Sequence, residues 1–167
     1  MSSKTDRTLA ALGSAIQIYQ AAVADFGREM ARLLGVNETD LRCLELLLDV
    51  DELTPGDLAA ALGLTTGGVT AMLDRLERLD LLTRDPHPSD RRRSLVRITQ
   101  EAARCCVELL SPLIEEGRVV LTARFDASQL TLVTEFLSAS TRTQTRYVEQ
   151  LRHMPTQRTN RRAGTRG

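Results

Sequence analysis

The sequence of 167 residues has no tryptophan and few other aromatic residues, two tyrosines and three phenylalanines. Glycine and proline are scarce, with ten and five copies, and such a chain favours helices. No apolar run approaches the roughly 18 residues that cross a membrane, and residues 1–7 lack the apolar stretch of a secretion signal. We therefore expect a cytoplasmic protein with no membrane contact.

Cysteine and histidine are too few to suggest a metal site. The cysteines, Cys43, Cys105 and Cys106, contain no C-x-x-C pair, and there are only two histidines. We interpret the cysteines as small core residues in a reducing compartment, with a thiol-based redox sensor as the alternative. Because the chain also lacks a Gly-rich phosphate loop, a nucleophile elbow and a metal motif, we expect neither an enzyme nor a cofactor.

The net charge of zero conceals an uneven distribution. Residues 152–167 carry five arginines and no acidic residue, which leaves 17 basic against 22 acidic residues in the rest of the chain. Within that acidic body, residues 84–97 hold five arginines and two aspartates. Two local basic patches on an acidic protein are typical of a DNA-binding protein that touches DNA through one surface.

A long N-terminal helix is predicted over residues 8–34. Its apolar residues recur alternately every three and four positions: Leu9, Leu12, Ile16, Tyr19, Val23, Phe26, Met30 and Leu33. A heptad stripe of this length indicates packing against other helices. We expect a dimerisation helix within residues 1–35, with packing on the chain's own core as the alternative.

Four later helix starts share one local pattern. The cap residues Asn37, Thr54, Thr65 and Asp126 each lie between two apolar residues that can pack together, and three of them precede an acid or glutamine by three positions. Gly68 stands where the acid after Thr65 would be. The pattern predicts helices over residues 37–50, 54–62, 65–79 and 126–151.

The remaining segments complete a mainly α fold with a small β-hairpin wing. Residues 81–85 and 94–99 are short strand candidates, and residues 100–124 form a helix that Pro112 should kink or break. We predict a winged helix-turn-helix domain over residues 36–99, C-terminal helices over 100–151, and a basic tail over 152–167 that is disordered from residue 155.

The two short helices carry the pattern of a helix-turn-helix. Ala59 lets the helices cross closely, Gly63 permits a positive φ in the turn, and Val69 is the branched apolar residue four positions past the cap. The outer surface of the second helix begins with small uncharged residues, and Thr70 can contact a thymine methyl or a base edge in the major groove. We expect DNA contacts from Thr65, Thr66, Gly67, Gly68, Thr70, Ala71 and Arg75. The alternative is a solvated helix that uses its glycines for packing.

The loop between the strand candidates is the second element expected at DNA. Its arginines can enter a minor groove or bind phosphates, and its expected contact residues are Asp90, Arg91, Arg92 and Arg93. A solvated charge run is the alternative.

These motifs resemble the MarR family (multiple antibiotic resistance regulators). The resemblance covers residues 36–99, with the supporting stretches at residues 62–70, 73–77, 90–92 and 95–99. It implies a homodimer built from the first and last two helices, a wing in which Asp90 orients Arg92, and repression relieved by small aromatic or lipophilic molecules. Two positions depart from the family pattern, because Asp80 and Ala102 stand where glycine is usual.

We therefore expect a dimeric transcriptional repressor that binds a pseudo-palindromic operator in double-stranded DNA. One alternative is a redox sensor on the same scaffold, although the peroxide sensors of this family place their cysteine in the first helix, where this chain has none. A winged helix that serves only as a protein-interaction module is the other alternative.

Overall fold

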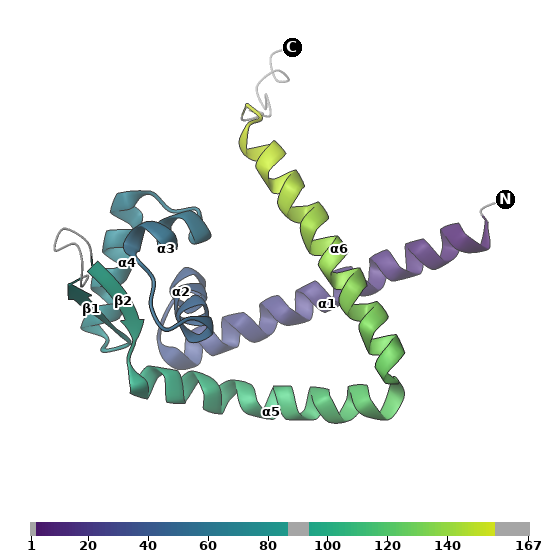
Figure 1. The fold of residues 1–167 in the computed structure, drawn as a ribbon, viewed down its shortest axis with the longest axis horizontal. Helices are drawn as coiled ribbons and strands as arrows, with labels where there is room; N and C mark the ends of the chain where they lie inside the picture. Colours follow the sequence, from purple (N-terminus) through teal and green to yellow (C-terminus); the bar gives the residue numbers. More distant parts are fainter. Residues whose placement is uncertain (1–2, 87–93, 156–167) are drawn as a thin grey trace, which may run out of the picture. The chain divides into compact units, whose positions relative to one another are not determined.

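The computed structural model describes residues 3–86 and 94–155, and the chain divides into two compact units, residues 1–113 and 114–167. The elements are α1 (Lys4–Leu34), α2 (Glu38–Asp49), α3 (Pro55–Leu62), α4 (Thr66–Arg78), β1 (Leu82–Pro86), β2 (Ser94–Ile98), α5 (Gln100–Arg124) and α6 (Ala127–Arg152). Figure 1 shows them as a mainly helical fold with one β-hairpin, which confirms the predicted fold class. Within the described ranges, no helix combines the length and apolarity that crossing a membrane requires.

The predicted helix caps are confirmed. Asn37, Thr54 and Asp126 each accept a hydrogen bond from the backbone N–H three residues later, over 2.9, 3.2 and 2.9 Å. In each case the side chain at that later position accepts one in return, so each forms a capping box. Local sequence therefore fixes where α2, α3 and α6 begin.

Helix α1 begins four residues earlier than predicted. Ser3 accepts a hydrogen bond from the N–H of Asp6 over 3.1 Å, and its own N–H donates to the Asp6 carboxylate over 2.8 Å. The signal was in the sequence, because Ser3 and Asp6 have the spacing of a capping box. Apolar periodicity alone places the start too late, since the first turn of α1 is polar.

One core supports the winged helix-turn-helix. Its buried residues come from α2, α3, α4 and both strands: Cys43, Leu47, Leu58, Val69, Met72, Leu73, Leu76, Leu82 and Val96. Leu53, in the loop between α2 and α3, joins β2 by two backbone hydrogen bonds with Val96, of 3.1 and 2.8 Å. The strands pair antiparallel, with Leu82 opposite Ile98 and Pro86 opposite Ser94.

A second, smaller core lies where α1 ends. Met30 and Ala31 of α1 and Leu41 of α2 are its buried members, and Leu109 and Leu110 of α5 pack against it. The heptad stripe of α1 therefore divides. Phe26 and Met30 lie on the chain's own core. Four other members are each more than half open to solvent: Leu9, Tyr19, Val23 and Leu33.

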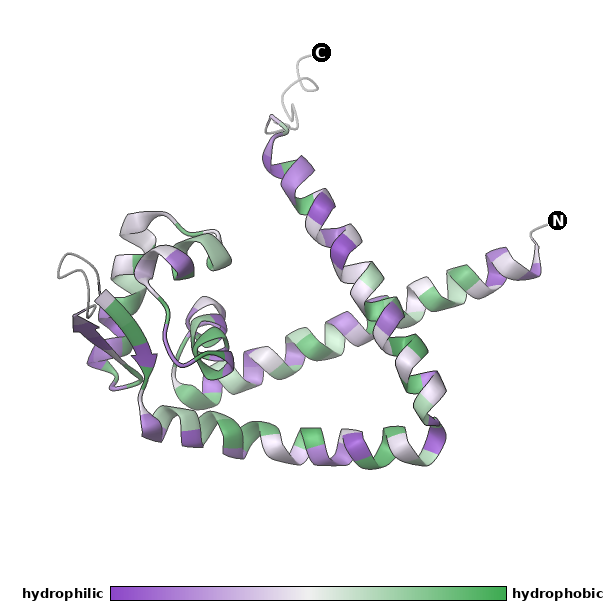
Figure 2. Ribbon diagram, in the orientation of Figure 1, coloured by the Kyte–Doolittle hydropathy of each residue, from purple (hydrophilic) through white to green (hydrophobic). Residues whose placement is uncertain are grey.

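The second unit holds the end of α5 and the whole of α6. None of the residues of α6, all of which are described, is buried. Figure 2 shows hydrophobic residues spread along this helix between hydrophilic ones.

Of the kink or break predicted at Pro112, the break does not occur, because α5 runs from Gln100 to Arg124 as one helix. Proline removes one backbone N–H, and the carbonyl that loses its partner belongs to Glu108. Both residues are exposed, so water can solvate that carbonyl.

Candidate DNA interface

The turn between α3 and α4 has the geometry that the sequence predicts. Gly63 ends α3 with φ 66°, in the left-handed region that glycine occupies at little cost. The N–H of Leu64 then donates to the carbonyl of Ala59 over 3.0 Å, which closes the turn. Thr65 caps α4 by accepting from the N–H of Gly68 over 3.2 Å. The chain therefore changes direction between α3 and α4.

One face of α4 is buried in the core. Val69, Met72, Leu73 and Leu76 are each at most 2% exposed. The positions between them must point outward, because side chains three and four residues apart share a helix face. Of the expected DNA contacts on this helix, six are exposed: Thr65, Thr66, Gly67, Gly68, Thr70 and Ala71.

The two glycines of α4 serve different purposes. A Cβ at Gly67 would meet no atom within 4 Å, so packing within the chain does not require glycine there. A Cβ at Gly68 would lie 3.3 Å from the Thr65 hydroxyl oxygen and 3.8 Å from Cβ of Leu64. Gly68 therefore keeps room for the cap, and Gly67 leaves a stretch of backbone open on the outer face.

Arg75 has a partner that the sequence did not predict. Its Nε donates to Asp40 Oδ2 over 2.8 Å and its Nη2 to Oδ1, so that the guanidinium spans the whole carboxylate. Asp40 is fully buried and the Arg75 side chain is 39% exposed. These hydrogen bonds raise the pKa of Arg75, which remains charged. This ion pair ties α4 to the start of α2, and a DNA contact by Arg75 stays a prediction.

The base of the wing is held to α4 by Arg84 of β1. Its Nη2 donates to Asp74 over 2.7 Å and its Nε to Glu77 over 3.0 Å. The hydrogen bonds with Glu77 and then Asp74 raise the pKa of Arg84. Two carboxylates that would repel phosphates are thus paired with a cation.

The strands of the wing are tied to the rest of the domain by Arg97. It donates to Asp85 across the hairpin over 2.8 Å and also to Glu52, in the loop before α3. The wing residues expected at DNA, Asp90, Arg91, Arg92 and Arg93, lie outside the described residues.

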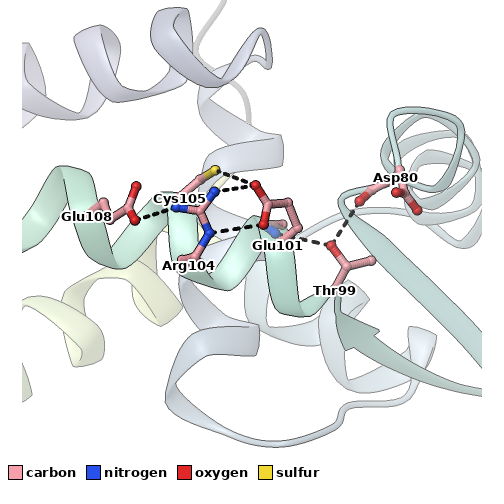
Figure 3. A network of polar contacts seen from close by, with 7 residues as sticks. Asp80, Thr99, Glu101, Arg104, Cys105 and Glu108 are labelled. Carbon is pink, nitrogen blue, oxygen red and sulfur yellow. Dashed lines mark hydrogen bonds and ion pairs between the residues drawn. The ribbon is translucent and has the colours of Figure 1, made fainter.

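The exit from α4 accommodates both departures from the expected glycine pattern. Asp80 adopts φ 57°, the left-handed conformation in which glycine is usual. Figure 3 shows Thr99 between this turn and α5. The Thr99 hydroxyl donates to the Asp80 carbonyl over 2.9 Å and accepts from the N–H of Ala102 over 3.2 Å. Thr99 therefore caps α5 and fixes the turn, and Ala102 fits there, 3% exposed.

Two of the three thiols are buried, as the core interpretation requires. Burial, with the nearby charge of Asp40 adding to it, raises the pKa of Cys43 to about 12. Burial also raises the pKa of Cys106. Reactive cysteines need the thiolate form, so these two are poor candidates for a sensor. Cys105 is partly exposed, and its closest polar partner is the Glu101 carboxylate at 3.8 Å (Figure 3).

Known proteins similar to this chain are transcriptional regulators. A sequence model described as "MarR family" matches residues 34–93. The chain is 32% identical over 112 residues to the HTH-type transcriptional regulator YcgE of Bacillus subtilis, covering 67% of this chain and 72% of that protein. It is 33% identical over 67 residues to the HTH-type transcriptional regulator MhqR of the same organism, covering 40% and 46% of the two chains.

Solved structures share the fold. A mutant of MepR from S. aureus is similar with a TM-score of 0.65 and 19% identity, over 79% of this chain and 96% of that one. A mutant of MarR from E. coli, solved with operator DNA, is similar with a TM-score of 0.55 and 23% identity, over 83% and 99% of the two chains.

Proposed function

The chain belongs to the MarR family of DNA-binding transcriptional regulators, and on this premise we propose that it is a homodimeric repressor whose operator is released when a small aromatic or lipophilic molecule binds. The observation that carries this proposal is the outer face of α4. The buried face of α4 packs into the core, and the exposed residues at the N-terminal end of α4 are small and uncharged. Such a surface can approach base edges in a major groove without a clash or a repelling charge.

Dimerisation is supported by large apolar side chains that are exposed in the described part of the chain. In α6, Leu132, Leu137 and Leu151 are 65%, 51% and 62% exposed. Leu9 and Tyr19 of α1 are equally open. Large apolar surfaces of this kind are typical of obligate interfaces. Two copies would present two α4 helices, which suits a pseudo-palindromic operator.

We assign the protein no catalytic role and no cofactor. Within the described residues, the polar clusters are ion pairs that join wing and helices or stabilise helix surfaces, and no group of histidine, cysteine and acidic residues could hold a metal. The proposed partner, operator DNA, assigns the protein to the cytoplasm.

The wing gives the proposal a direct test. An operator is selected from random duplexes, and affinity is measured by fluorescence anisotropy at several salt concentrations, for that operator and for a scrambled duplex. We expect Arg92→Ala to weaken both complexes and to reduce the salt slope by about two, about one for each subunit of the proposed dimer, because each phosphate contact releases counterions. Arg42→Ala removes the same charge from the exposed surface of α2, where Arg42 pairs with Glu45, and should leave both affinities unchanged.

Asp90 separates two accounts of the same loop. If it orients Arg92, Asp90→Ala weakens binding although it removes a negative charge near DNA. If Asp90 acts only through its charge, the variant binds more tightly. Absence of binding to any duplex at low salt would contradict the DNA-binding function itself and favour a protein-interaction module.

A further inference from the structure

The recognition helix has few side chains free to form hydrogen bonds with base edges. Helix α4 contains no lysine, asparagine or glutamine. All of its long polar side chains bind protein groups within the described residues: Asp74, Arg75, Glu77 and Arg78. Arg75 pairs with Asp40, both acids pair with Arg84, and Arg78 donates to the carbonyl of Asp74 over 3.1 Å. The bidentate hydrogen bonds that identify guanine or adenine require arginine, lysine, asparagine or glutamine, and this helix offers none that is free at its N-terminal end.

The free surface of α4 is instead built from small groups. Gly67, Thr70 and Ala71 are exposed and lie three and four residues apart, which places them on one helix face. The Thr70 hydroxyl donates to the carbonyl of Thr66 over 3.0 Å, so its proton is used within the helix. The Thr70 oxygen can still accept a hydrogen bond, but it has no free proton to donate. Its γ-methyl remains for a partner, with the Ala71 methyl beside it and open backbone at Gly67.

We propose that Thr70 is a specificity-determining residue that reads a thymine through its C5-methyl group. Thymine is the one base with a methyl group in the major groove, and a methyl-bearing face without free long side chains is complementary to it. The operator half-site should therefore carry thymine opposite Thr70. This inference rests on the proposed DNA-binding function and adds the chemistry by which the helix selects its bases.

The test replaces thymine by deoxyuridine, which lacks only the C5-methyl. An operator is first selected from random duplexes with the wild-type protein. Each thymine is then replaced symmetrically in both half-sites, one position at a time, and affinities are measured by anisotropy. We expect at least one position at which each lost methyl contact weakens binding about fourfold, while thymines outside the α4 footprint are insensitive.

Two variants of Thr70 assign the contact. Thr70→Val keeps the γ-methyl and removes the hydroxyl, so it should retain the full deoxyuridine effect at the sensitive position. Thr70→Ser keeps the hydroxyl and removes the methyl, so it should bind the thymine operator about fourfold more weakly per half-site and become insensitive to deoxyuridine there. Thr70 is exposed, and circular dichroism checks that both variants keep the wild-type helix content.

Each possible result decides the matter. A deoxyuridine effect that Thr70→Ser abolishes and Thr70→Val preserves supports the proposal. Two results overturn the proposal and leave DNA binding intact. One is an operator in which no deoxyuridine weakens binding, and the other is a loss of affinity in Thr70→Val but not in Thr70→Ser. A deoxyuridine effect that Thr70→Ser does not change overturns the assignment to Thr70. Failure to select any duplex refutes the proposed function rather than this inference.

Discussion

The backbone of Asp80 occupies the left-handed region at the exit of α4, where a side chain is costly. Helices α1 and α3 end at Gly35 and Gly63 with φ of 68° and 66°, whereas Asp80 has φ 57°. Aspartate tolerates this region better than most residues, because its short polar side chain can bond locally. The strain is therefore modest, and the turn is held by the Thr99 hydroxyl on the Asp80 carbonyl.

Substitutions at this residue should change stability in a fixed order. We predict that Asp80→Gly raises the free energy of unfolding by about 0.5–1 kcal/mol, since glycine adopts positive φ without steric cost. Asp80→Ala should lower it by a similar amount, because alanine adopts positive φ less readily than aspartate. Urea denaturation at one protein concentration measures both. A Gly variant no more stable than the Ala variant would show that φ is not what limits this turn.

At the scale of elements, the orientation of α4 depends on a charge in another helix. The Asp40 carboxylate completes the capping box of α2 by accepting from the N–H of Asn37 over 3.4 Å. It also binds Arg75, 35 residues later, and is fully buried. A buried carboxylate that loses its cation keeps its desolvation cost. The ion pair therefore matters more through what its loss exposes than through any gain in stability.

Removal of the arginine should be correspondingly severe. We predict that Arg75→Ala lowers the free energy of unfolding by about 2–3 kcal/mol, somewhat less than for a fully buried pair because Arg75 is half-exposed. Arg42→Ala, which breaks the exposed pair with Glu45 on the same helix as Asp40, should cost less than about 1 kcal/mol. Adding Asp40→Asn to Arg75→Ala should recover part of the loss. Equal costs for the two arginine variants would contradict the role given to Asp40.

The elements show what could be predicted from the sequence and what could not. Caps such as Asn37 and Thr54 were predicted correctly because every group involved lies within six residues. The Asp40–Arg75 pair was missed because its partners are brought together only by packing of α2 against α4. The break predicted at Pro112 does not occur, since a helix surface open to water tolerates one lost hydrogen bond. Thr70 was predicted as a DNA contact from the sequence, but only the structure shows that its hydroxyl proton is donated to Thr66 and its methyl is left open.

At the scale of the whole molecule, the proposed dimer rests on the exposed apolar side chains of α6. We predict that the wild-type protein sediments as a dimer at micromolar concentration, and that Leu137→Lys dissociates it or prevents its folding, because a charge would be buried in the interface. Val50→Lys is the matched control, since Val50 is similarly exposed, at 44% against 51%. It lies at the C-terminal end of α2, in the winged helix-turn-helix domain. Sedimentation velocity measures both variants. A folded wild-type monomer would contradict the proposed interface.

None of the 26 residues of α6 is buried, so in the proposed dimer this helix is covered only once a newly synthesised chain has paired with another. The stability of such a protein is inseparable from its abundance. While most chains are still unpaired, a doubling of synthesis raises the number of complete dimers about fourfold, by mass action. Occupancy of the target promoters should therefore rise more steeply than the amount of protein synthesised. At low synthesis most chains are single, and their exposed α6 is open to cellular proteases.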